Sequence, residues 1–146
     1  MSTDKKVIIG IALATVAILT GGVFFMSGDT STSVASDQIV SQNGIHWHPK
    51  LAVTINGKKQ EFTDSIGLGA VHQPMHTHEE DYKDGVVHME MQGLVTKDET
   101  RLGKFFQIWG KKFDKTDKTN MLVNGKKNSD FDMYEMKDND KIEIYF

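Results

Sequence analysis

The stretch IHWHPKLAVTING, residues 45–57, combines a strand pattern with the turn that should end it. Its odd-numbered positions are mostly apolar and its even-numbered positions, apart from Ala52, are polar: Ile45, Trp47, Leu51, Val53 and Ile55 alternate with His46, His48, Lys50 and Thr54. This period of two predicts one strand over residues 45–55 with a single buried face, which places Trp47 in the core. Pro49 lacks an amide donor, which favours an edge position or a bulge there. Asn56-Gly57 suits a type I′ turn, so residues 58–62 are expected to return as the hairpin partner.

Two further patterns follow this hairpin. Residues 85–92 alternate again, and we expect Met89 and Met91 in the core, with His88 and Glu90 together on the opposite face. In residues 100–109 the apolar side chains recur at the i, i+3, i+4 and i+7 spacing of an amphipathic helix: Leu102, Phe105, Phe106 and Trp109. Gly110 is a natural stop for that helix. A last group of strands is predicted over residues 120–123 and 141–146, with a second Asn-Gly turn at residues 124–125.

The beginning of the chain differs in composition from the rest. Residues 7–26, VIIGIALATVAILTGGVFFM, carry no charged side chain and follow Lys5 and Lys6. At about 1.5 Å per helical residue, this length matches a bilayer hydrocarbon core of roughly 30 Å. We therefore expect residues 1–26 to be a cytoplasmic stub and a transmembrane anchor, with a cleavable signal peptide as the alternative. Because lysines precede the span, the positive-inside bias places the rest of the chain outside the membrane.

The remainder divides into a linker and one domain. Residues 27–43 are mostly small and polar and are expected to be a flexible linker. Residues 44–146 then form a single extracytoplasmic domain. The chain has no cysteine, which excludes disulfides, iron–sulfur clusters and thiolate copper centres. The net charge of −3 indicates no nucleic-acid partner.

All six histidines lie within residues 46–88, and five of them fall in three short clusters: His46 and His48, His76 and His78, and His88. Residues two apart on a strand face the same side, so each His-x-His pair can direct two imidazoles toward one point. Imidazole is the commonest protein ligand for zinc and copper, and affinity in the divalent series peaks at copper. We expect these five histidines to converge on a single copper or zinc site, with His72 outside it. The following Glu79, Glu80 and Asp81 are candidate carboxylate ligands or acceptors that orient an imidazole.

Two resemblances add to this interpretation. The segments HWHPKLAVTING, HTHEEDYKDGVVHME, LGKFFQIWG and a late VNG resemble a family of small, exported, mostly uncharacterised archaeal and bacterial proteins, over residues 45–146. That resemblance implies an anchored extracytoplasmic domain with histidines in fixed places. The order of hairpin, inserted strand, helix and strands resembles the β-grasp, an α+β fold in which a mixed sheet packs on one helix. The tail also resembles sulfur carriers of that fold, but it ends in Ile144-Tyr145-Phe146 without Gly-Gly, so carrier function is not expected.

Three classes of function remain open from the residues alone. The first is a binding module that captures metal at the cell surface. The second is a metal-dependent enzyme, which needs an open coordination position and a base such as Glu80 or Glu90. The third is a structural or interaction subunit of a membrane complex, stabilised by its metal. No nucleophile, phosphate-loop or dinucleotide motif is present, which favours binding over catalysis.

Overall fold

The computed structural model describes residues 34–146. In chain order the elements are η1 (Ser36–Gln38), β1 (Ile39–Ser41), β2 (Ile45–Trp47), β3 (Lys50–Ile55), β4 (Lys58–Lys59), β5 (Met75–His76), η2 (Tyr82–Asp84), β6 (His88–Met91), β7 (Val95–Thr96), η3 (Asp98–Thr100), α2 (Leu102–Ile108), β8 (Asn120–Val123), β9 (Lys126–Lys127), η4 (Phe131–Met133) and β10 (Lys141–Tyr145). The predicted membrane anchor of residues 7–26 lies outside the described residues. Among the helices of residues 34–146, none is long and apolar enough to cross a membrane.

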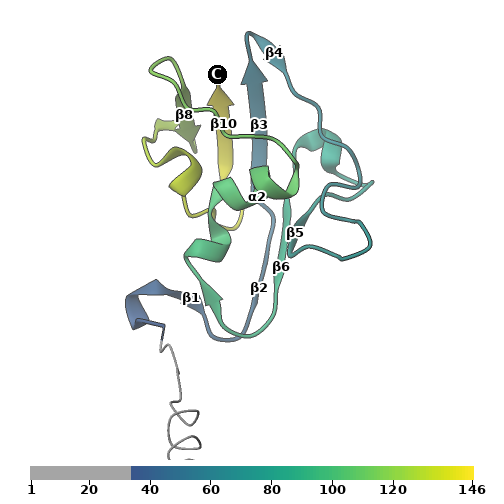
Figure 1. The fold of residues 1–146 in the computed structure, drawn as a ribbon, viewed down its shortest axis with the longest axis vertical. Helices are drawn as coiled ribbons and strands as arrows, with labels where there is room; N and C mark the ends of the chain where they lie inside the picture. The colour runs from purple at the N-terminus through teal and green to yellow at the C-terminus, as the bar shows by residue number, and fades with distance from the viewer. Residues whose placement is uncertain (1–33) are drawn as a thin grey trace, which may run out of the picture. The chain divides into compact units, whose positions relative to one another are not determined.

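A mixed five-stranded sheet contains the predicted hairpins, in the strand order β4-β3-β10-β8-β9 (Figure 1). The last strand, β10, lies between β3, to which it is parallel, and β8, to which it is antiparallel. Both predicted Asn-Gly turns are confirmed by positive φ at both residues: 50° and 76° at Asn56 and Gly57, and 53° and 75° at Asn124 and Gly125. The chain therefore forms an α+β fold around a mixed sheet.

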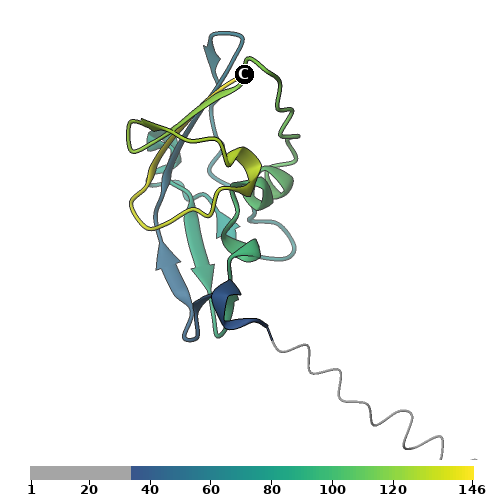
Figure 2. The same cartoon turned by 90° about the vertical axis from the view of Figure 1, so that its left-hand side faces the viewer.

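The helix α2 packs on one side of this sheet, as Figure 2 shows, and its apolar stripe fills the core. Leu102, Phe105 and Phe106 are buried, and Trp109 is partly buried against them. Gly110 follows the helix with φ of 71° and donates its amide to the Gln107 carbonyl, as expected of a helix stop. The helix prediction is confirmed, although it begins at Leu102 because Asp98–Thr100 form a 3-10 turn instead.

The first hairpin is shorter than the sequence predicts. Its second strand, β4, covers only Lys58–Lys59 and not the whole of residues 58–62. The chain leaves the sheet edge there because Phe62 turns into the core, where its ring packs edge-on against Phe105 and Trp109 at centroid distances of 5.6 and 4.7 Å. Burial of an aromatic side chain thus takes precedence over further strand pairing.

The prediction of one strand over residues 45–55 is wrong in a way that matters for the histidines. The segment is two strands in two sheets: β3 belongs to the five-stranded sheet, whereas β2 joins a three-stranded sheet in the order β2-β6-β5. The break between the two strands falls at His48 and Pro49. Pro49 is buried there and has no amide to donate to either sheet. Trp47, predicted to be core, is only partly buried.

A smaller correction concerns the predicted linker. Residues 39–41 form β1, which pairs antiparallel with β7, and the Lys97 amide donates to the Gln38 carbonyl. The end of the segment expected to be flexible is therefore hydrogen-bonded to the folded domain. Only Ile39 and Val40 of this strand are apolar, and two residues are too few to show a strand period.

Candidate metal centre

Strand order and register gather histidines on one face of the three-stranded sheet. The central strand β6 pairs with β2 on one side, where Trp47 lies opposite Met89. The same register continues beyond the end of β2 to the bridge between Lys50 and Val86, so His48 lies opposite His88. On the other side β5 places His76 opposite the same His88. Because alternate residues of a strand share a face, the buried Met89 points away from these three imidazoles and into the core.

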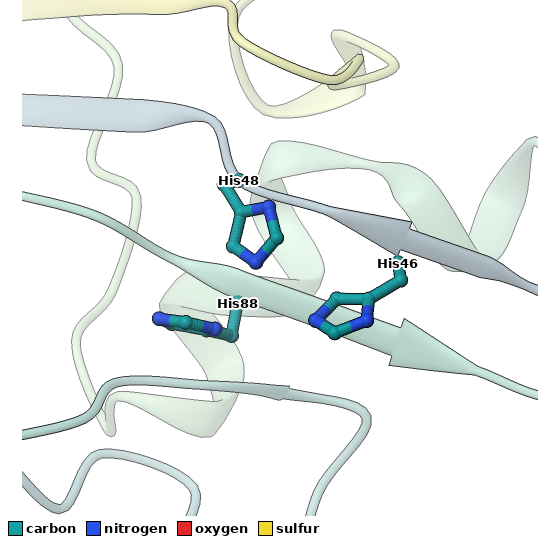
Figure 3. A group of neighbouring side chains, drawn as sticks. All are labelled: His46, His48 and His88. Atoms are coloured by element: carbon teal, nitrogen blue, oxygen red, sulfur yellow. The ribbon is translucent and has the colours of Figure 1, made fainter.

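His46, His48 and His88 form a first set of potential ligands, called here the three-histidine group (Figure 3). One ligand nitrogen from each residue lies within 4.8 Å of the other two. The ring centroids are 4.8 Å apart for both the His46–His48 and the His48–His88 pairs. Figure 3 shows the rings gathered over the same side of β2 and β6, so their nitrogens can approach one ion.

His76, His78 and Glu90 form a second set, called here the histidine–glutamate group, whose ligand atoms also lie within 4.8 Å of one another. Nε2 of His76 is 3.0 Å from Nε2 of His78 and 3.8 Å from Oε1 of Glu90. Two nitrogens bound to one tetrahedral zinc ion at about 2.0–2.1 Å are about 3.3 Å apart. The observed nitrogen separation is thus close to what a bound ion requires.

The hydrogen bond on the far side of the His76 ring sets which nitrogen is free. Nδ1 of His76 lies 3.0 Å from the carbonyl oxygen of Gln73. A carbonyl oxygen only accepts, so Nδ1 carries the proton and Nε2 of the neutral ring carries the lone pair. This is the arrangement in which metal-binding imidazoles are usually held.

The pKa of His76 is lowered from its ordinary value, mainly because burial disfavours the charged ring. The nearby His72 and His78 lower it further, while the hydrogen bond to Gln73 and the Glu90 carboxylate oppose the shift. The side chain is only 1% exposed. At neutral pH His76 is therefore an uncharged imidazole with its lone pair directed toward His78 and Glu90.

Two aspartates support the three-histidine group from outside. The carboxylate oxygens of Asp81 lie 3.0 and 3.1 Å from Nε2 of His88, so Nε2–H donates to Asp81 and Nδ1 is the nitrogen left for a ligand bond. Oδ1 of Asp138 accepts the His48 backbone amide at 2.9 Å and lies 4.0 Å from its Nδ1. Asp81 thus orients the His88 ring, whereas Asp138 fixes the backbone of His48 at the break between β2 and β3.

The five predicted histidines are brought together, but in two groups instead of one. The groups touch, because the His88 ring is 4.5 Å from that of His78 and 5.8 Å from that of His76. Oε1 of Glu90 is also 3.3 Å from Nε2 of His46, so this carboxylate stands between the groups. The exposed His72, expected outside the site, lies at its edge with its ring 4.4 Å from that of His76.

The sequence pointed to one of two further contributors only in part, and to the other not at all. Glu90 was expected on the face of His88 and as a candidate base, but its place among the potential ligands depends on the pairing of β5 with β6, which brings His76 beside it. Asp138 is distant in sequence and no local pattern pointed to it. Of the three candidate carboxylates after His78, Asp81 contacts a histidine, while Glu79 and Glu80 are exposed.

Access to the second group is from the surface. A hollow there is lined by His72, Gln73, Pro74, His76, Glu90 and Gln92. With three protein ligands, each group leaves the fourth position of a tetrahedral ion for water or another small ligand. The domain therefore carries two histidine-rich groups that could each hold a metal ion. No known protein family, curated protein or solved structure matches this chain.

Proposed function

We propose that this protein is a membrane-anchored, extracytoplasmic metal-binding protein that holds copper or zinc through His46, His48, His76, His78 and His88. The single observation that carries the proposal is the state of His76. Its ring is buried and neutral, its Nδ1–H donates to the Gln73 carbonyl oxygen, and its Nε2 lone pair accepts a hydrogen bond from Nε2–H of His78 at 3.0 Å, a contact that an ion can replace. Such an arrangement prepares a ligand nitrogen before any ion arrives.

Packing gives no competing reason for the cluster. The core is on the opposite face of the three-stranded sheet, where Met75 and Met89 are buried. Six imidazoles in a connected row of ring contacts would repel one another if they carried charge, which is an electrostatic cost without a gain in packing. Metal binding compensates for that cost, because one ion satisfies several lone pairs together.

The ligand chemistry favours copper or zinc over other ions. Imidazole suits zinc, copper, iron and nickel, whereas magnesium and calcium prefer oxygen ligands. The three-histidine group matches the three-imidazole sets known for zinc, and copper has the highest affinity in the divalent series. The chain has no thiolate that would compete for either ion.

The support for the proposed membrane location comes from the sequence. The uncharged residues 7–26 after Lys5 and Lys6, and the resemblance to exported proteins, support a single-pass anchor with the metal-binding domain outside. An uncleaved anchor would keep the mature protein in membranes after a carbonate wash. A soluble product that begins near Ser36 would show instead that the segment is a signal peptide.

We also propose that the five-stranded sheet and α2 form a β-grasp-like unit. The support is that the first and last strands of the unit, β3 and β10, are its parallel central pair, that each is flanked by a hairpin strand, and that the helix lies between the two hairpins in the chain. In this arrangement the sheet of the metal centre, β2-β6-β5, is an addition to the unit.

Competition with a chromophoric chelator tests the proposed function. The purified full-length protein should withdraw Cu(II) and Zn(II) from the chelator, and His48→Ala and His88→Ala should each weaken that competition. His72→Ala is the matched control, because it removes an imidazole from the same surface but from neither group. Equal competition by all four proteins would contradict the assignment of the ligands.

A further inference from the structure

The two groups use separate residues and still lie against each other. The three-histidine group draws on β2, the residue that follows it and β6, and the histidine–glutamate group draws on β6 and the segment that begins with β5. Building on the proposed metal-binding function, we propose that the cluster is a two-metal centre. The three-histidine group holds one divalent copper or zinc ion, and the histidine–glutamate group holds a second.

Ligand geometry argues against one ion shared by all six side chains. Each ligand atom must lie about 2 Å from its ion, so atoms on one ion are separated by at most about 4.2 Å. Within each group three ligand atoms lie within 4.8 Å of one another, which small side-chain movements can close. A tetrahedral zinc ion takes four ligands, so the three ligands of one group and one further ligand complete its sphere.

The free nitrogens also divide between the groups. Gln73 holds Nδ1 of His76, which leaves Nε2 facing His78. Asp81 holds Nε2 of His88, which leaves Nδ1 for the three-histidine group. The rings of His76 and His88 are nearly parallel, at 15°. Their hydrogen bonds to Gln73 and Asp81 nevertheless leave nitrogens free for two different ions.

Glu90 connects the two positions. Its Oε1 is 3.3 Å from Nε2 of His46 and 3.8 Å from Nε2 of His76, one residue from each group. A carboxylate has two oxygens and can bind an ion with each, which suits the ion separation of about 3.5–4 Å in two-metal sites. Two dications repel each other, and neutral imidazoles do not offset that repulsion, but the carboxylates of Glu90, Asp81 and Asp138 do.

Metal stoichiometry of the full-length protein tests this inference. Metal-free protein is dialysed against Cu(II) or Zn(II), and bound metal per chain is measured by elemental analysis. We expect two ions per chain for the wild type and one for Glu90→Gln. Glu80→Gln, which removes the same charge from an exposed site nearby, should keep two. The copper-loaded wild type should show the broadened electron paramagnetic resonance spectrum of two interacting ions, and Glu90→Gln should show an isolated ion.

Any other number of bound ions contradicts part of the proposal. One ion per wild-type chain overturns the two-metal centre and leaves the proposed function standing, whereas no bound ion overturns both. Two ions in Glu90→Gln as well as in wild type overturn the assignment of the second position. His78→Ala provides a second variant for that position, and circular dichroism shows whether each variant is folded.

Discussion

Replacing Asp81 by asparagine should weaken metal binding without removing a proposed ligand. The Asp81 carboxylate accepts a hydrogen bond from Nε2 of His88 at 3.0 and 3.1 Å, and the two side chains are only 29% and 14% exposed. Partners of this kind fix the orientation and tautomer of a ligand imidazole, and their loss typically costs 10- to 100-fold in metal affinity. We expect a loss in that range for Asp81→Asn, which corresponds to about 1.4–2.8 kcal/mol.

The assay is a competition titration of the full-length protein with Zn(II) and a chelator of known affinity. Glu80→Gln is the matched control, since it removes one negative charge from the adjacent exposed residue. A purely long-range charge effect would weaken both variants equally. If Asp81→Asn binds zinc as tightly as Glu80→Gln does, the support of His88 by Asp81 has no role in binding, and the reasoning is refuted.

Three further predictions concern the fold and its pH dependence. Phe105→Ala, at a fully buried ring, should lower the free energy of unfolding in urea by about 3–5 kcal/mol, and a loss below about 1 kcal/mol would contradict the packing of α2. Gly85→Ala should destabilise the protein more than Gly57→Ala in the same urea assay; both glycines have positive φ, but only at Gly85 would the new methyl group collide with the Leu51 carbonyl oxygen. With metal removed by EDTA, the free energy of unfolding should fall as pH drops below about 6.5, because His76 binds a proton in the unfolded chain but, with its lowered pKa, not in the folded one. His76→Gln should make the free energy of unfolding depend less steeply on pH. An equally steep dependence in this variant would argue against a buried neutral ring.

Local patterns in the sequence predicted the elements that have a strong period or a specific turn. The i, i+3, i+4 spacing of Leu102, Phe105 and Phe106 identified α2, because burial of one helix face requires it. The Asn-Gly pairs identified both hairpin turns, because few other residues adopt positive φ at two successive positions. Alternation around Met89 correctly placed His88 and Glu90 on the face opposite the core side chain.

What the sequence did not reveal depends on pairing between distant strands. Residues 45–55 keep their alternation across Pro49, so the pattern gives no sign that the chain passes from one sheet to another. The division of the histidines follows from the central position of β6 between β2 and β5, which no local period encodes. The contact of Asp138 with His48 spans ninety positions and was beyond prediction for the same reason.

Elemental analysis of the purified full-length protein tests the central claim most directly. The protein is exposed to equal amounts of copper, zinc, nickel, magnesium and calcium, freed of loosely bound ions and compared with a variant carrying both His48→Ala and His88→Ala. We predict copper or zinc in at least stoichiometric amount on the wild type, and a clear loss of that metal from the variant. Wild-type protein that retains no more of these metals than the folded variant does would contradict metal binding as the function of the histidine cluster.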